Sequence, residues 1–125
     1  MKEYDASSTP DSKEWLELGE TEQLDLVVDF VEKYEKDIEN AAKKLHASIH
    51  VIVENQLAME SEPTPETYSR LRKQGLNRHE TIHAIGAVLA EDMFKIIKGD
   101  KDQATNNYKD RLKKLTAKRW KKGKW

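Results

Sequence analysis

The stretch NRHETIHAIGAVLAEDMFKIIKG, residues 77–99, decides the fold. Asn77 and Glu80 have the spacing of a capping box, which satisfies backbone N–H groups at the start of a helix. Gly99 is the residue type that most often ends one. Between them apolar or small residues recur with helical spacing and are expected to face inward: Ile82, Gly86, Leu89, Met93 and Ile97. The stretch therefore predicts a long helix over 77–98 that packs one face against a core.

The same signals, followed outward, predict further helices over 12–18, 22–39, 40–59, 65–74 and 105–119. Gly75 stands where a left-handed residue would end the 65–74 helix. Tyr34 lies on the expected apolar stripe of 22–39, and Leu45 on that of 40–59. No useful segment alternates as a strand does, so the fold class is all-α: a compact helical bundle of about five helices with no sheet.

The organisation along the chain follows from the same patterns. Residues 1–11 lack periodicity and are expected to be loose. Residues 12–119 are expected to form a single helical domain, and residues 120–125 a basic C-terminal tail. A chain of 125 residues is long enough to bury a real hydrophobic core.

Composition excludes several classes of protein. No apolar run approaches the roughly 18 residues that cross a bilayer, and no apolar stretch follows Met1, so neither a membrane span nor a signal peptide is expected and the protein is interpreted as cytoplasmic. The chain has no cysteine, which excludes disulfides, thiolate metal sites and thiol catalysis. Its five glycines stand singly, which excludes glycine-rich phosphate loops.

The net charge of −1 hides an asymmetry. Residues 1–40 carry 13 acidic and 4 basic side chains, whereas residues 109–125 carry 9 basic side chains and one acidic. The basic segment either folds back on the acidic one or binds an acidic partner such as nucleic acid, with Trp120 and Trp125 able to stack on bases. The first option is preferred because the chain as a whole has no excess positive charge. The sequence leaves open whether the chain forms a homo-oligomer.

All four histidines form two pairs, His46/His50 and His79/His83. Each pair is spaced i, i+4 on an expected helix, which places both imidazoles on one face about one turn apart. If the two helices pack together, the four rings converge, and Glu54 continues the first face by another turn. Such a set suits a divalent transition metal, with zinc the first choice and nickel, iron or copper as alternatives. The predicted ligands are therefore His46, His50, His79 and His83, with Glu54 as an extra ligand.

Two other interpretations use the same residues. Residues 79–83 match the HExxH pattern of zinc hydrolases, in which Glu80 would be the catalytic base. The third ligand of the extended pattern is missing, since Leu89 stands there, and no strand is available to hold an extended substrate. A di-iron site, as in ferritin-like or hemerythrin-like bundles, lacks ligands because no histidine follows His83. One ion held by both helices, in a non-catalytic role or one still to be defined, requires the fewest missing residues and is preferred.

A structural alternative also stands: the histidines are polar groups of the core without a metal, and the protein is an interaction module whose basic tail contacts an acidic partner.

The patterns LHxxxHVxVENQ (45–56) and GLxRHExIHAIG (75–86) resemble an uncharacterised bacterial family of small helical proteins, classed as a domain of unknown function. The resemblance spans about residues 12–98. It implies a soluble bacterial cytoplasmic protein and brings no activity, ligand or partner.

Overall fold

The computed structural model describes residues 1–97, 99 and 101–123, and for residues 101–107 it describes the backbone alone. Within this part of the chain every regular element is helical, and the all-α prediction is confirmed. The elements are α1 (Ser12–Glu17), α2 (Glu20–Tyr34), α3 (Asn40–Ala58), α4 (Thr64–Lys73), α5 (Arg78–Ile97), α6 (Lys101–Lys114) and α7 (Ala117–Lys121). The described residues thus hold seven helices rather than about five.

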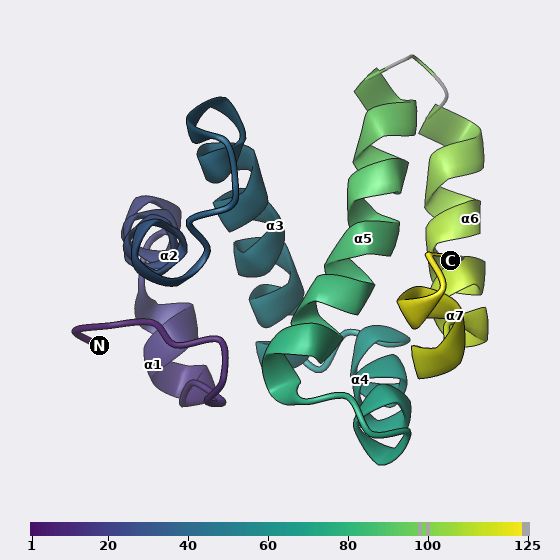
Figure 1. The fold of residues 1–125 in the computed structure, drawn as a ribbon, viewed down its shortest axis with the longest axis horizontal. Coiled ribbons are helices and arrows are strands. Elements are labelled where there is room, and N and C mark those ends of the chain that lie inside the picture. The colour runs from purple at the N-terminus through teal and green to yellow at the C-terminus, as the bar shows by residue number, and fades with distance from the viewer. Residues whose placement is uncertain (98, 100, 124–125) are drawn as a thin grey trace.

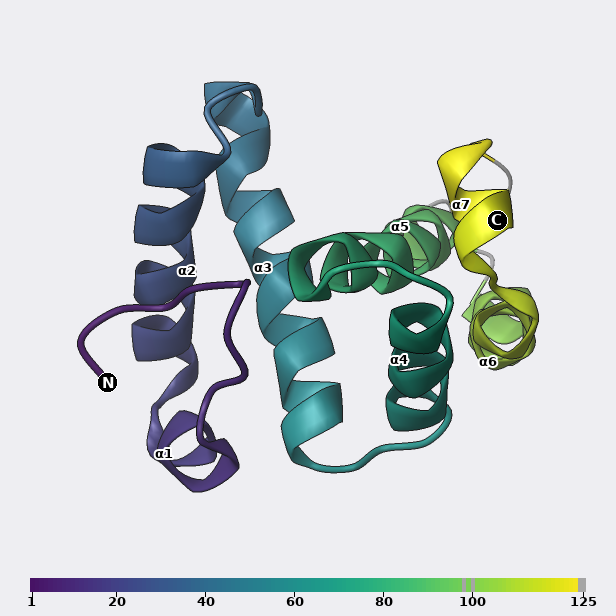
Figure 2. The ribbon, with the colours of Figure 1, turned by 60° about the horizontal axis from the view of Figure 1, so that its bottom comes forward.

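Helices α2 and α3 lie side by side as an antiparallel pair, and α5 crosses α3 on the face opposite α2 (Figures 1 and 2). Helix α6 returns along α5, with α7 at its end, while α4 packs near the start of α5 (Figure 1). This arrangement places α3 and α5, the two helices that carry the histidines, in the middle of the molecule.

The apolar residues form two cores, one on each side of α3. The first, which we call the N-terminal core, contains Tyr4, Ala6, Trp15, Val27, Phe30, Val31, Ala47 and Val51. The second, the C-terminal core, contains Val53, Leu71, Leu76, Ile82, Ala84, Ile85, Val88, Leu89, Leu112, Leu115 and Ala117. Helix α3 contributes to both, which agrees with a helix that is apolar over much of its circumference.

The helix ends that the sequence predicts around α4 and α5 are present in the structure. The backbone N–H of Asn77 donates to Glu80 Oε1 (2.9 Å), and the N–H of Glu80 donates to Asn77 Oδ1 (2.8 Å), which completes the capping box. Gly75 has φ +101°, the left-handed conformation expected after α4. These local signals hold because both partners of each contact lie within one helical turn.

The N-terminal segment differs from the prediction that residues 1–11 are loose. The side chain of Tyr4 is 4% exposed and that of Ala6 is fully buried. The Tyr4 ring packs edge-on against Phe30 and tilted against Trp15, with centroids 5.4 and 5.7 Å apart. Burial of an aromatic ring holds this segment on the N-terminal core even though it forms no helix.

The C-terminal region also differs from the prediction of one helix over 105–119 and a tail from residue 120. Arg70 donates to the carbonyls of Leu112 and Leu115, which lets α6 end there with its last carbonyls satisfied. Thr116 then caps α7, accepting a hydrogen bond from the N–H of Arg119. Trp120 packs against the C-terminal core and is not a free tail residue, while Trp125 lies outside the described residues.

Three apolar residues expected inward are exposed. Tyr34 is 71% exposed because α2 ends there, and Ile97 is 76% exposed because the end of α5 extends past the core. Leu45 is 53% exposed, because the face of α3 that points inward is the one that carries His46 and His50. Lys98, the expected last residue of that helix, lies outside the described residues. In the part of the chain that the structure describes, no helix combines the length and the apolar character that a membrane span requires.

Candidate metal centre

The four histidines meet between α3 and α5, as their spacing predicts. Gly86 allows this approach, because a Cβ atom on it would lie 2.9 Å from Cγ2 of Ile49 on α3. A separation that short is a steric clash, so with a larger residue here either the Ile49 side chain or the helix would have to shift. The glycine lies about one turn after His83, and the close approach brings both histidine pairs to one place.

The rings present their Nε2 atoms to one another. Nε2 of His83 lies 3.2 Å from Nε2 of His50 and 3.1 Å from Nε2 of His79. The ring centroid of His46 lies 4.9 Å from that of His50 and 5.1 Å from that of His83. Each neutral imidazole has one N–H, so a set of facing ring nitrogens cannot all be satisfied by one another.

The carboxylate of Glu35 completes the group. Its Oε1 atom lies 2.5 Å from Nε2 of His79, 2.8 Å from that of His83 and 3.2 Å from that of His50. Its Oε2 atom contacts Nε2 of His46. Five side chains from α3, α5 and the end of α2 therefore surround one small volume; we call this group, Glu35, His46, His50, His79 and His83, the histidine–glutamate cluster.

Glu35 is absent from the predicted ligands, and the sequence predicts only that it lies within a helix over 22–39. That helix ends at Tyr34, and Glu35 has φ −121° and ψ 53°, outside helical geometry. A signal was nevertheless present: Glu35 continues the spacing of Val27 and Val31, both fully buried. A carboxylate at the end of a buried stripe is either paired or a ligand, because an isolated buried charge is too costly.

The electrostatics favour the deprotonated carboxylate of Glu35 and the neutral imidazole of His50. Burial by itself would raise the pKa of Glu35, but its contacts with the ring nitrogens of His46, His50, His79 and His83 outweigh this effect and lower the pKa well below its ordinary value. Burial lowers the pKa of His50, which is 1% exposed, and so favours its neutral form. An ionised carboxylate and neutral imidazoles are the states that bind metals.

Two atoms of the cluster are buried without an acceptable hydrogen bond: Oε2 of Glu35 and Nε2 of His46. They contact each other, yet their mutual geometry does not satisfy either of them. Buried polar atoms are nearly always hydrogen-bonded or bound to a metal, so an unsatisfied donor and acceptor at the same spot need an explanation.

The distances between Nε2 atoms match those between ligands of one ion. Ligands about 2.0–2.1 Å from a metal lie about 2.9 Å apart at right angles and about 3.4 Å apart at the tetrahedral angle. The two Nε2–Nε2 distances of 3.1 and 3.2 Å fall between these limits. Ligand atoms of Glu35, His46, His50 and His83 all lie within 4.8 Å of one another, and the group could hold a metal ion. His79 contacts Glu35 and His83 but does not belong to this group of four.

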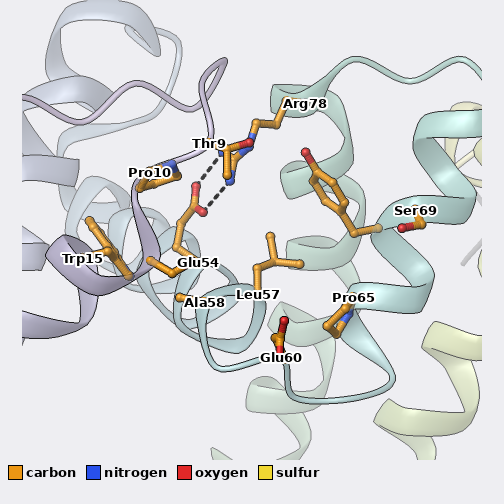
Figure 3. Close-up of a pocket in the computed structure, with 12 residues that line it drawn as sticks. Thr9, Pro10, Trp15, Glu54, Leu57, Ala58, Glu60, Pro65, Ser69 and Arg78 are labelled. Carbon is orange, nitrogen blue, oxygen red and sulfur yellow. Dashed lines mark hydrogen bonds and ion pairs between the residues drawn. The ribbon is translucent and has the colours of Figure 1, made fainter.

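Glu54 lies outside the cluster, contrary to its predicted place among the ligands. Its two oxygens accept hydrogen bonds from Arg78 at 2.7 and 2.8 Å, and Oε2 also accepts one from the Tyr4 hydroxyl at 2.5 Å. Arg78 and Glu54 are 4% and 2% exposed, so this is a buried ion pair (Figure 3). A bidentate guanidinium occupies the lone pairs that a metal would need.

Glu54 nevertheless reaches the cluster indirectly, through Tyr4. The Tyr4 oxygen lies 3.2 Å from Nδ1 of His50. Because the hydroxyl donates its proton to Glu54, it can only accept from His50, which assigns the proton of His50 to Nδ1. Nε2 of His50 then carries a lone pair directed into the cluster. Supporting hydrogen bonds of this kind orient metal-binding histidines in general.

Glu80 is not placed for the role of a catalytic base. Its carboxylate accepts the Asn77 N–H in the capping box at the start of α5. The HExxH pattern therefore has a complete structural explanation for its glutamate, while His79 and His83 belong to the cluster. The geometry gives no support to a hydrolase of that type.

The cluster is partly accessible to solvent. His46, His79 and His83 are 23%, 27% and 33% exposed, whereas Glu35 is 6% exposed at its side chain. A cavity of about 300 Å³ adjoins it, lined by His46, Ile49, His50, Ile82, His83, Gly86, Ala87 and Trp120. A molecule of solvent size can reach the donors from this side.

Comparisons of the chain with models of protein families, with curated proteins and with solved structures find no match. The fold and the cluster describe an all-α protein with a group of histidine and glutamate side chains that could hold a metal ion. The resemblance to an uncharacterised bacterial family stays a prediction.

Proposed function

We propose that the protein binds one divalent transition-metal ion through Glu35, His46, His50 and His83, with His79 as a fifth donor. The observation that carries the proposal is the convergence of four Nε2 atoms on one carboxylate, with Nε2–Nε2 distances of 3.1 and 3.2 Å. Hydrogen bonds alone explain this arrangement poorly, because with the proton of His50 on Nδ1 its Nε2 atom has no proton to share with Oε1 of Glu35, 3.2 Å away.

The donor set indicates which metals to expect. Imidazole nitrogen with one carboxylate suits zinc, copper, iron and nickel, whereas calcium and magnesium prefer oxygen ligands. Zinc remains the first candidate, because three histidines and one glutamate make a four-coordinate set. A contribution from His79 as a fifth ligand would favour iron or nickel, which accept higher coordination numbers.

The position of the ion suggests what it does for the fold. Glu35 follows α2 in the N-terminal core, His46 and His50 lie on α3, and His79 and His83 lie on α5, which belongs to the C-terminal core. An ion held by all three elements links the two cores. Binding to the folded state alone would stabilise the protein by about 4 kcal/mol at a free metal concentration 1,000 times Kd.

Metal analysis tests the proposal. The protein is purified without a nickel column, and its metal content is measured by plasma mass spectrometry for wild type, His50→Ala, His83→Ala and Glu35→Gln. We expect close to one equivalent of one metal in wild type and at most one tenth of it in the three variants. Glu32→Gln is the matched control, since Glu32 is an exposed glutamate on α2.

The result that contradicts the proposal is equally definite. Wild-type protein that contains only trace metal, and takes up none of zinc, cobalt, nickel, copper or iron during reconstitution, would show that the cluster is a metal-free polar network of the core. Equal metal content in wild type and all three variants would place the ion elsewhere.

A further inference from the structure

The cavity beside the cluster leads to a more specific inference, which rests on the proposed metal site. Three of the proposed ligands, His46, His50 and His83, line this cavity of about 300 Å³. Its volume lies at the lower end of the range for pockets that hold small organic molecules, roughly 300–1,000 Å³. An ion bound by these three imidazoles would face the cavity directly.

The other donors lie on a different side. His79 lines a separate cavity of about 380 Å³, formed with Tyr4, Phe30 and Tyr34 among others. Glu35 is 6% exposed at its side chain and binds from the end of α2. An ion held by the cluster would therefore have the cavity lined by His46, His50 and His83 on one side, and Glu35 and His79 on the other.

The walls of the cavity determine what can enter. Apart from the histidines it is lined by Ile49, Ile82, Gly86, Ala87 and Trp120. Among the residues whose side chains the structure describes, none that lines it is Lys, Arg, Asp or Glu. A charged group held away from the ion, against these walls, would lose its hydration without gaining a charged side chain as a partner, which is unfavourable. An apolar body would contact isoleucine side chains and an indole ring, which is favourable.

We propose that the cavity binds a small uncharged molecule that coordinates the metal through one nitrogen or oxygen atom and packs its apolar body against Ile49, Ile82 and Trp120. Trp120 comes from α7, so the short C-terminal helix forms one wall of the ligand site. This gives α7 a role in ligand binding in place of the acidic partner suggested by its charge.

Cobalt(II) provides the probe, since its visible bands report changes of coordination. The full chain is loaded with cobalt and titrated with pyridine, an uncharged flat nitrogen donor, and with nicotinate, which carries the same donor and a carboxylate that cannot chelate the same ion. We expect pyridine to shift the bands in a saturable way and nicotinate to bind at least tenfold more weakly.

Ala87→Leu tests the place of binding. The larger side chain fills the cavity and removes no donor, so pyridine affinity should fall at least tenfold while cobalt stoichiometry stays at one. Ala90→Leu is the matched control: the same substitution about one turn further along α5, at a residue that lines a different hollow with Glu91, Phe94 and Lys95. Trp120→Ala, which removes a wall instead of filling the space, is the second variant, and it should also weaken pyridine binding.

Each other outcome decides a different question. A cobalt-loaded protein whose spectrum does not respond to pyridine overturns this inference and leaves the metal site in place. Unchanged pyridine affinity in both Ala87→Leu and Trp120→Ala overturns the location, and equal binding of nicotinate overturns the uncharged class. A chain that takes up no cobalt overturns the proposed function itself, and this inference with it.

Discussion

Replacing Tyr4 by phenylalanine removes one oxygen atom that touches both the cluster and the buried ion pair. The hydroxyl donates to Glu54 at 2.5 Å and accepts from Nδ1 of His50 at 3.2 Å. The phenyl ring in the Tyr4→Phe variant would keep the packing against Trp15 and Phe30, whose centroids lie 5.7 and 5.4 Å from that of Tyr4. The substitution therefore isolates the hydrogen bonds from the apolar contact.

The magnitude follows from what each partner loses. Glu54 keeps both contacts to Arg78, so its charge stays compensated. The N–H of His50 is left buried without an acceptor, which costs about 1–3 kcal/mol of stability. Loss of the group that orients a metal-binding histidine typically weakens metal binding by about 10–100-fold. We expect the apo protein to unfold at a lower denaturant concentration and the Kd for zinc to rise within that range.

Competition with a chromophoric chelator measures the Kd, and urea unfolding of the apo protein measures the stability. Tyr34→Phe is the control: this tyrosine is 71% exposed and packs its ring on Phe30. It should leave both quantities unchanged. A Kd for Tyr4→Phe within threefold of wild type would refute the reasoning, because the orientation of His50 would then depend on ring packing alone.

Three further perturbations have defined outcomes. Gly86→Ala should force α3 and α5 apart and weaken zinc binding. Overpacking should lower the free energy of unfolding by about 1–3 kcal/mol, against a gain of about 1 kcal/mol in helix propensity. Ile49→Ala in the same chain should restore the zinc affinity, because it removes the clashing methyl group. Glu80→Ala should remove the half of the capping box that Glu80 supplies and cost about 0.3–1.5 kcal/mol in urea unfolding. Metal analysis should find one equivalent as in wild type, and loss of the metal would place Glu80 in the site. Removal of zinc by a chelator should lower the melting temperature, measured by calorimetry, by about 10–20 °C relative to protein with free zinc at 1,000 times Kd. An unchanged melting temperature would exclude a link between the two cores through the ion.

The helices were predictable because their signals are local. The capping box of Asn77 and Glu80 and the left-handed Gly75 each depend on atoms within one turn of the chain. The two histidine pairs were predictable for the same reason, since spacing i, i+4 determines which residues share a face. That the two faces meet was a hypothesis from the sequence, and the structure brings Nε2 of His50 on α3 to within 3.2 Å of Nε2 of His83 on α5.

The contacts that were not predicted join residues far apart in sequence. Glu54 extends the histidine face of α3, but its partner Arg78 lies 24 positions away and Tyr4 lies 50 positions away. Periodicity identifies the face on which a carboxylate lies, and it does not identify which group will neutralise it. Residues 1–11 were expected to be loose for a related reason, because a segment without regular structure has no periodic signal even when its aromatic residue is buried.

Glu35, inside the cluster, and Glu54, outside it, are two buried carboxylates with different roles. Both are buried, and each must be compensated, because an isolated buried charge costs several kcal/mol. Arg78 already compensates Glu54, so this pair adds no net charge near the ion. Glu35 has no guanidinium or ammonium group among its contacts in the described part of the chain, only four imidazoles that are neutral in their metal-binding state. A divalent cation at the point where those imidazoles converge would supply the missing positive charge. Four neutral imidazoles, one carboxylate and one divalent ion leave a single positive charge in the centre, which an uncharged ligand in the adjoining cavity would not alter.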